Sequence, residues 1–266
     1  MKISRRWAIT AGAAAAIACS PTLSTSAAAS SAASAGTSAT ARAASLRVMT
    51  WNINSEKALN FWGWVDVIAN QKPDVVSLQE ACTNDAPVLA RWLKGRGLDY
   101  HVEIRPTNIH WACGFGSQGQ VILSKQKPHS VVKRDYRSSD NQRRGYLAET
   151  IDIDGRPIRI VNTHAYNNTG GWEKPTDNVN QLANWAASGA ETAQIITGDL
   201  NATPRQVTPL YRAGLKDADP THRTTKGTVK LDYILYRGAP ALQGPTQVIK
   251  SPSSDHSMVV TNFRIG

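Results

Sequence analysis

Polar residues able to do chemistry lie at the ends of apolar runs in this chain of 266 residues. They are Asn52 and Asn54, Gln79 and Glu80, Asn162 to His164, Asp199 and Asn201, Asp232, and Asp255 and His256. The set consists of carboxylates, amides and two histidines, with no obvious serine or cysteine nucleophile. Oxygen ligands without thiolates suit Mg²⁺, Mn²⁺ or Ca²⁺. The pattern predicts metal-assisted chemistry at a rim formed by strand ends.

The order of these motifs is more informative than any one of them. Along the chain they read Thr-Trp-Asn52, Leu-Gln-Glu80, Asn-Thr-His164, Gly-Asp199-Leu-Asn201, Leu-Asp232-Tyr-Ile and Ser-Asp255-His256. This series resembles the endonuclease/exonuclease/phosphatase family of DNase I-like metal-dependent phosphoesterases, in a secreted bacterial-type member, over residues 46–264. The resemblance implies an α/β fold, a four-layer sandwich of two packed, mostly antiparallel sheets flanked by helices, with the active site at one rim.

The resemblance also implies which residues hold the metal and the substrate. Asn52 and Glu80 would bind the metal through oxygen, and Asp255 would lie near it. Arg143 and Arg144 precede a predicted hairpin, and we expect one of them to contact a substrate phosphate; the alternative is a solvated pair.

Catalytic roles follow from the same resemblance. His256 would be the base that takes a proton from the attacking water, and Asp232 would fix its tautomer. Asp199 and Asn201 would position water and phosphate. His164 would donate a hydrogen bond to the phosphate or assist the leaving oxygen. The reaction implied is direct attack of water at phosphorus, without a covalent enzyme intermediate.

Hydrophobic patterns predict the elements that position these residues. Short β-rich runs predict strands over 46–51, 74–78, 120–124, 130–133, 194–198, 231–236 and 258–263. Apolar spacing predicts helices around 59–68, 86–95 and 178–187. The clearest hairpin joins 147–153 to 156–164 through Asp154-Gly155, a dipeptide typical of tight turns. Strands outnumber helices, which favours a layered protein with two sheets.

The N-terminal segment predicts export. Basic residues at 2, 5 and 6, an Ala-rich apolar run over 7–19 and small residues after it predict a signal peptide over 1–29. Arg5-Arg6 resembles a twin-arginine signal, although the residues after Trp7 fit that pattern loosely. Residues 30–45 are predicted to be a linker and 46–266 the catalytic domain. The apolar run is too short for a membrane span, so we expect an extracellular protein without stable membrane insertion; a lipoprotein attached through Cys19 is the alternative.

Charge favours a polyanionic partner. Without residues 1–44 the chain has 26 Lys and Arg against 20 Asp and Glu, a net charge of +6. Basic residues concentrate at Lys125, Lys127, Lys133, Arg134, Arg137, Arg143 and Arg144, where they would contact flanking phosphates if they formed part of the rim. We therefore expect a monomeric nuclease with nucleic acid as substrate. A phospholipase-C-like enzyme such as a sphingomyelinase and a small-molecule phosphatase are the alternatives, since core sites are shared across substrates.

Two further features concern cysteines and an apolar segment. Cys82 and Cys113 are the cysteines that remain after the predicted signal peptide, and an even count in an exported chain favours one disulfide over two buried thiols. Ile109 to Phe115 is the only candidate for the exposed apolar hairpin that a phospholipase reading would want.

Overall fold

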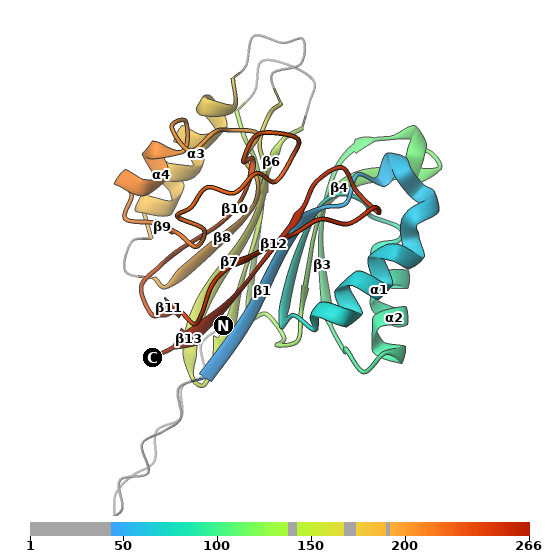
Figure 1. Ribbon diagram of the computed structural model, residues 1–266, viewed down its shortest axis with the longest axis horizontal. Coiled ribbons are helices and arrows are strands. Elements are labelled where there is room, and N and C mark those ends of the chain that lie inside the picture. Colours follow the sequence, from blue (N-terminus) through green and yellow to red (C-terminus); the bar gives the residue numbers. More distant parts are fainter. Residues whose placement is uncertain (1–43, 138–142, 168–173, 190–191) are drawn as a thin grey trace, which may run out of the picture. The chain divides into compact units, whose positions relative to one another are not determined.

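The computed structural model describes residues 44–137, 143–167, 174–189 and 192–266, all within the compact unit Arg42–Gly266 (Figure 1). The side chains of residues 57–59 are also outside the description. The predicted signal peptide, and the predicted linker up to residue 43, lie outside the described residues. Ala44 and Ser45 were expected to end the linker, but they begin the first strand, where they pair with Ile265 and Arg264.

The first sheet has seven strands in the order β11-β13-β1-β2-β4-β3, with β12 also paired to β13. Their bounds are β1 Ala44–Asn52, β2 Val75–Cys82, β3 His101–Ile109, β4 Ser117–Ser124, β11 Pro240–Leu242, β12 Gln247–Ile249 and β13 Met258–Ile265. Within this sheet only β1 and β2 pair in parallel. The first strand therefore lies in the middle of the sheet, between β2 and the last strand.

The second sheet has six strands in the order β5-β6-β7-β8-β10-β9. Their bounds are β5 Ser130–Asp135, β6 Gly145–Ile153, β7 Arg156–His164, β8 Gln194–Asp199, β9 Lys216–Asp217 and β10 Asp232–Arg237. The predicted hairpin is confirmed: Ile153 of β6 pairs with Arg156 of β7, and both turn residues have positive φ, 50° at Asp154 and 74° at Gly155. The predicted strands at 120–124 and 130–133 exist as β4 and β5, which belong to different sheets.

Helices cover the two outer faces, which completes the four predicted layers (Figure 1). On the first sheet lie α1 (Phe61–Gln71) and α2 (Ala86–Gly95), preceded by the short 3-10 helix η1 (Ser55–Asn60). On the second lie α3 (Pro175–Ala187) and α4 (Thr208–Arg212). A further 3-10 turn, η2 (Trp111–Cys113), lies between β3 and β4. In the described part of the chain, no helix is both long and apolar enough to cross a membrane.

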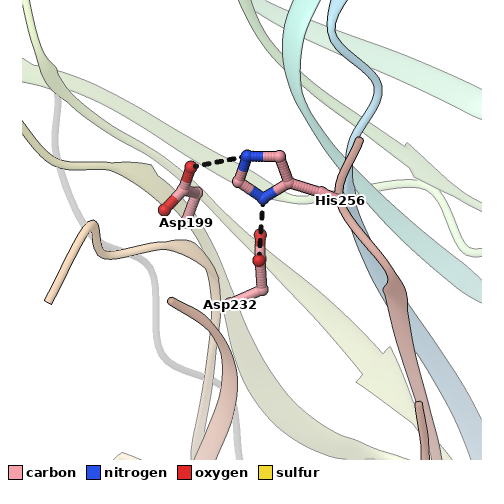
Figure 2. A group of neighbouring side chains, drawn as sticks. All are labelled: Asp199, Asp232 and His256. Carbon is pink, nitrogen blue, oxygen red and sulfur yellow. Dashed lines mark hydrogen bonds and ion pairs between the residues drawn. The ribbon is translucent and has the colours of Figure 1, made fainter. Parts of the chain in front are cut away.

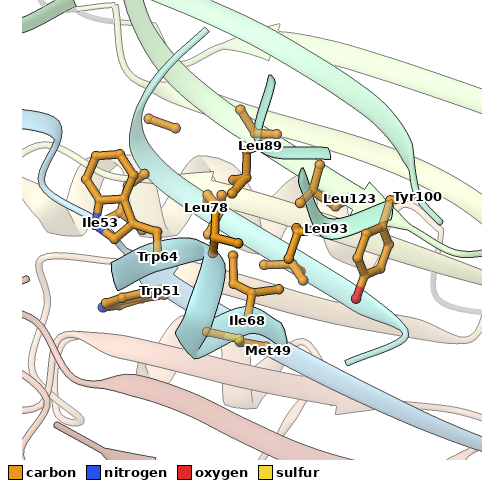
Figure 3. Packing of buried hydrophobic residues seen from close by; sticks show 14 of the residues in the cluster. Met49, Trp51, Ile53, Trp64, Ile68, Leu78, Leu89, Leu93, Tyr100 and Leu123 are labelled. Carbon is orange, nitrogen blue, oxygen red and sulfur yellow. The ribbon is translucent and has the colours of Figure 1, made fainter. Parts of the chain in front are cut away.

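Buried apolar side chains form three clusters, one for each interface between layers. Figure 3 shows the first, where Ile68 of α1 and Leu93 of α2 pack on Met49, Leu78 and Leu123 of the first sheet. The middle cluster joins the inner faces of the two sheets. Each described sheet therefore has apolar packing on both of its faces.

One carboxylate is buried in the middle interface. Glu149 of β6 is 1% exposed and lies on the same face of the strand as Leu147 and Ile151, which belong to the cluster between the sheets. Burial raises the pKa of Glu149 to about 7, and the charge of Glu103 adds to this, while the hydroxyl of Ser124 lowers it. The core therefore contains a group whose charged form is disfavoured.

Candidate active site

Strand topology brings the predicted site residues to one rim. Two parallel pairs, β1–β2 and β7–β8, end at this rim, so the residues at their carboxyl ends are neighbours. The antiparallel strands β10 and β13 start at the same rim. In register, Asp199 is paired with both His164 and Asp232. Residues separated by up to about two hundred positions thus meet because of how the sheets are connected.

The centre of the site is a buried pair of Asp232 and His256 (Figure 2). His256 Nδ1 lies 2.9 Å from Asp232 Oδ2, and both side chains are almost completely buried. Nε2 on the other side of the ring is 3.8 Å from Asp199 Oδ2 and has no hydrogen-bond partner among the described residues. Burial would lower the pKa of His256, but Asp232 and Asp199 outweigh burial and raise the pKa to about 9. The ring therefore has a high affinity for a proton, and its Nε2 faces Asp199 without a hydrogen bond.

The loop that carries His256 is fixed by the first strand. Ser254 Oγ donates to the backbone oxygen of Asn52 at 2.7 Å and accepts from the backbone N–H of His256 at 3.1 Å. Trp51 Nε1 donates to the backbone oxygen of His256 at 3.0 Å. These bonds hold the orientation of a histidine that lies outside any strand, which is what a preorganised base requires.

Asp199 is the second buried carboxylate of the centre. Burial raises the pKa of Asp199 to about 7, and the charge of Asp232 adds to this, while His256 and hydrogen bonds from Asn201 and Asn52 lower it. Asn201, with φ 45°, donates its backbone N–H to Asp199 Oδ1 at 2.8 Å. At the preceding Gly198 (φ 137°) a Cβ would collide with the backbone of Thr163. The Gly-Asp-Leu-Asn motif thus reflects close strand packing as well as a polar function.

Amide side chains join the two sheets beneath this centre. Asn52 of the first sheet donates its Nδ2 to Asp199 Oδ2 of the second at 3.0 Å. Gln79 Nε2 donates to Asn162 Oδ1 at 2.7 Å, and Asn162 Nδ2 donates to the backbone oxygens of Leu78 and Val121. All of these amides are buried. They fix the spacing of the two sheets where both contribute residues to the site.

Glu80 lies on an irregularity of β2. Its φ is 54°, and the register between β2 and β4 shifts between Leu78 and Ala81. A bulge of this kind re-aims a side chain at the end of a strand, and a left-handed backbone at a non-glycine residue is frequent at functional sites. Glu80 Oε1 lies 3.7 Å from His164 Nε2, with a quarter of its side chain exposed. It is therefore far more open to a ligand than the buried carboxylates of Asp199 and Asp232.

His164 and Arg144 are in direct contact. Arg144 Nη1 lies 2.6 Å from Nδ1 and 2.9 Å from Nε2 of His164, which is also 3.6 Å from Asp199 Oδ2. Burial and the charge of Arg144 hold the pKa of His164 well below its usual range. His164 is therefore neutral, which suits a hydrogen-bonding role toward phosphate.

Arg143 and Arg144 are positioned by groups that the sequence analysis did not single out. Arg143 is paired with Asp135 Oδ2 at 3.0 Å. The buried Arg105 donates to Asp135 Oδ1 at 2.5 Å and to the backbone oxygen of Arg144 at 3.2 Å. Arg105 lies in mid-strand before Pro106, where nothing in the sequence distinguishes it from a surface arginine.

Asp255 directly precedes His256 in the chain but is engaged by other groups. Its carboxylate accepts from Asn54 Nδ2 at 2.9 Å and lies 3.3 Å from Lys226 Nζ. Burial would raise its pKa, but Asn54 and Lys226 outweigh burial and hold the pKa below its usual range. Lys226 was not anticipated from the sequence. The predicted proximity of Asp255 to a metal stays a prediction.

The expected basic rim is only partly present. Lys125 forms a salt bridge of 2.8 Å with Asp74, which precedes β2 and is therefore at the end of that strand opposite Glu80. Lys133 is paired with Glu103 at 3.4 Å. The concentration of positive charge along the sequence thus spreads over both ends of the sheets, because β4 and β5 run away from and back toward the rim. Among the described basic residues of this stretch, Arg144 contacts His164 of the site, and Arg143 lines the same pocket as Glu80.

A pocket of about 250 Å³ opens beside Glu80. It is lined by Glu56, Glu80, Thr107, Asn108, His110, Gln118, Arg143, Arg144 and Asn167. The predicted disulfide is confirmed: Cys82, two residues after Glu80, is bonded to Cys113 in the β3–β4 connection. The bond attaches one wall of the pocket to the strand that carries Glu80.

Metal ligands are present in two arrangements. Asp199, Asp232 and His256 offer ligand atoms within 4.8 Å of one another and so could hold a metal. The other is Glu80, whose carboxylate is one-quarter exposed and which follows Gln79, the partner of Asn52 on the adjacent strand. A metal at the first arrangement would compete with the 2.9 Å hydrogen bond of Asp232 to His256, which favours the second.

Comparison with known proteins decides the family. Residues 49–256 match the model of the Endonuclease/Exonuclease/phosphatase family. The chain belongs to this family. Members are phosphoester hydrolases, so the chain is an enzyme of that class, and the predicted four-layer sandwich is confirmed as the family fold.

Individual relatives are distant. A UPF0294 protein of Vibrio parahaemolyticus is 22% identical over 232 residues, which cover 83% of this chain and 78% of that protein. An endonuclease/exonuclease/phosphatase structure from Beutenbergia cavernae has a TM-score of 0.67 and 20% identity, covering 84% and 72% of the two chains. A 3′ phosphatase from Neisseria, bound to a product DNA hairpin, has a TM-score of 0.65 and 19% identity, covering 82% and 99%. At such identities these structures show the shared fold alone.

Proposed function

We propose that this family member is a secreted, divalent-metal-dependent phosphodiesterase, and that its substrate is nucleic acid. One observation carries the proposal of water attack: a buried His256 fixed by Asp232, whose Nε2 has no partner among the described residues. The group that gives its proton to Nε2 must then come from water or from the substrate. The absence of a placed serine or cysteine nucleophile from this cluster of described residues supports direct hydrolysis.

The donor chemistry fits a divalent cation. Glu80 supplies a partly exposed carboxylate, and Asn52 supplies an amide oxygen that already accepts from the backbone N–H of Asn54 at 3.1 Å. Oxygen donors of this kind suit Mg²⁺, Mn²⁺ or Ca²⁺. When bound there, the metal would offset the negative charge that develops on the phosphoryl oxygens.

The chain's own residues then divide the remaining work. In its neutral form, with Nδ1–H donated to Asp232, His256 accepts the proton of the attacking water at Nε2. Asp199, 3.8 Å from that nitrogen, orients the water from the other side. The neutral His164 and the cationic Arg144 bind phosphate oxygens, and Asn201 holds Asp199 in place through its backbone N–H.

Nucleic acid is favoured over other phosphoesters by three considerations. The chain after residue 44 carries a net charge of +6, and an arginine pair lines the pocket beside Glu80. One structural relative was solved with product DNA, although that enzyme is a phosphatase. A sphingomyelinase-like activity is the second candidate, because Ile109, Trp111 and Phe115 are strongly exposed. Export through the N-terminal signal and a monomeric state complete the proposal.

A substrate panel tests this function. Plasmid DNA, RNA, sphingomyelin liposomes and sugar phosphates are offered with Mg²⁺, Mn²⁺ or Ca²⁺, across a salt series and after EDTA. We expect cleavage of nucleic acid that is abolished by EDTA, restored by metal, and weakened by salt, because phosphate contacts release counterions. Full activity after exhaustive chelation would overturn the metal requirement. Liposome hydrolysis without nucleic-acid cleavage would favour the phospholipase alternative.

A further inference from the structure

The most exposed apolar side chains in the described residues lie together in the β3–β4 connection, residues 109–117, which we term the aromatic hairpin. Ile109 is 72% exposed, Trp111 67% and Phe115 81%. His110 of this connection, with Asn108 near the end of β3, lines the pocket that contains Glu80. The aromatic hairpin is therefore one wall of the active-site entrance.

Neither packing nor backbone preference accounts for an aromatic residue at position 115. Phe115 has φ 63° and follows Gly114, which has φ 58°. The left-handed region is unfavourable for a bulky side chain, and with its ring largely in solvent Phe115 gains little from burial. A strained, exposed aromatic residue beside an active site points to a role in binding.

The aromatic hairpin is held in a fixed position relative to Glu80. Its Cys113 is bonded to Cys82, two residues after Glu80. His110 donates its backbone N–H to the oxygen of Gly116 at 2.9 Å, and its Nε2 lies 3.4 Å from Glu56 Oε1. The ring of Trp111 lies 5.7 Å from that of His110. Rings presented on a rigid support lose little conformational freedom on binding a ligand.

Two other exposed tryptophans differ from Trp111 in that their rings pack against each other. Trp62 of α1 and Trp92 of α2 are each about half exposed, but their rings contact edge to face at 4.7 Å. Both lie on helices, whereas Trp111 follows directly after His110, which lines the pocket beside Glu80. Trp92 therefore serves as a matched control for Trp111.

We propose that Trp111 and Phe115 stack on unpaired bases of a single-stranded nucleic acid whose phosphates lie along the Arg143–Arg144 side of the same pocket. This inference rests on the proposed nuclease function and narrows its substrate class. The two walls match the two chemistries of a polynucleotide: arginines meet phosphates, and uncharged aromatic rings meet bases. In a duplex the base faces are stacked on one another, so the rings would have nothing to bind.

The test compares binding and cleavage for variants of the rings. Trp111→Ala, Phe115→Ala, the double variant and the control Trp92→Ala are measured by fluorescence anisotropy in EDTA. The probes are a labelled single-stranded oligonucleotide of DNA or RNA, the same strand with abasic sites, and the duplex. KM and kcat are then measured with Mg²⁺ on the same substrates. Because both rings are exposed, the variants should keep the wild-type melting temperature, which is checked by circular dichroism.

We expect each ring variant to weaken single-strand binding by roughly tenfold, with the loss appearing in KM more than in kcat. The wild-type preference for the normal over the abasic strand should disappear in the double variant, while Trp92→Ala keeps it. Equal losses on single-stranded, abasic and duplex probes, or no loss at all, would overturn the inference and leave the nuclease function standing.

Two further outcomes also overturn the inference. If the ring variants lose binding to phosphatidylcholine–sphingomyelin vesicles while single-strand affinity is kept, the aromatic hairpin is a membrane contact. If the wild type neither binds nor cleaves any nucleic acid, the proposed substrate class and the inference fail together, and the metal-dependent phosphoesterase assignment is judged on the other substrates of the panel.

Discussion

The His256 side and the Glu80 side of the active site are built in opposite ways. The side chain of His256 is 1% exposed and that of its partner Asp232 is 0% exposed. Hydrogen bonds with Trp51 and Asn52 attach the loop that carries His256 to β1. On the other side Glu80 is one-quarter exposed on a bulge, and the aromatic hairpin next to it presents its rings to solvent. Proton transfer benefits from a dry, fixed environment, whereas substrate selection needs surfaces that a ligand can reach. The difference separates the residues expected to govern rate from those expected to govern affinity.

The largest effect should come from the buried side. His256→Ala removes the proposed base, so we expect kcat to fall by roughly 10²–10⁴-fold with little change in KM. His129→Ala is the control, because His129 is half exposed and paired with Asp152 away from the site. Steady-state kinetics on proteins of matched circular dichroism make the measurement. A variant that kept more than about a tenth of the wild-type rate would place the base elsewhere.

On the open side, Glu80→Gln should act through metal affinity. The substitution keeps the side-chain shape but removes the charge that attracts a divalent cation, so we expect at least roughly tenfold weaker Mg²⁺ or Mn²⁺ binding. Calorimetric titration of the metal gives the affinity, and thermal melting gives the stability, which should change little. Glu103→Gln, a partly buried carboxylate paired with Lys133, is the control. Unchanged metal affinity in Glu80→Gln would move the metal to the Asp199–Asp232–His256 group.

The disulfide Cys82–Cys113 should contribute both to the stability of the fold and to substrate binding on the Glu80 side. Replacing Cys82 and Cys113 together with Ser should lower the free energy of unfolding by roughly 3–4 kcal/mol, because the unfolded chain loses a closed loop. Urea unfolding with and without reductant measures this, and the reduced wild type should match the double variant. Because the disulfide holds the aromatic hairpin on the open side of the site, substrate affinity should fall more than kcat in the double variant. An equal unfolding free energy in both proteins would contradict the prediction.

A smaller effect concerns a buried carboxylate that, unlike Asp232, has no cationic partner. The pKa of Glu149 is raised to about 7 from its ordinary 4.5, so the folded state holds a proton that the unfolded state releases. Its favourable contribution is complete below about pH 4.5 and is lost as the pH rises through about 7, by about 3 kcal/mol in total. Glu149→Gln should remove this dependence and unfold at higher denaturant concentration at pH 8. Parallel stability curves for both proteins between pH 5 and 8 would refute it.

Much of this architecture could be predicted from the sequence, for identifiable reasons. The Asp154-Gly155 turn and the alternation on either side of it predict the β6–β7 hairpin, because only one register buries Ile151 and Ile158 together. The order of polar motifs predicts the pairing of His256 with Asp232 through the family resemblance. Geometry then confirmed that these two side chains meet at 2.9 Å.

The features that were missed depend on contacts distant in sequence. The strand β3 contains Pro106, which argues against a central strand, and β3 is tolerated because it lies at the edge of its sheet. Arg105 gains its role only from Asp135 and Arg144, and Lys226 only from Asp255. The basic residues at 125–137 looked like a single patch because sequence distance does not show that a strand crosses the whole sheet.

The pairing of β1 with β13 has a consequence for when the enzyme becomes active. Asn52 ends the first strand, His256 precedes the last, and the strand β1 needs β13 as its antiparallel neighbour. During synthesis, a chain that has grown to residue 250 lacks the base and leaves one edge of β1 unpaired. A proteolytic fragment cut within the final strand keeps His256 but loses part of the strand that pairs with β1. The site therefore cannot assemble until the segment that carries His256 and β13 has been made, although Asn52 and Glu80 are synthesised some two hundred residues earlier.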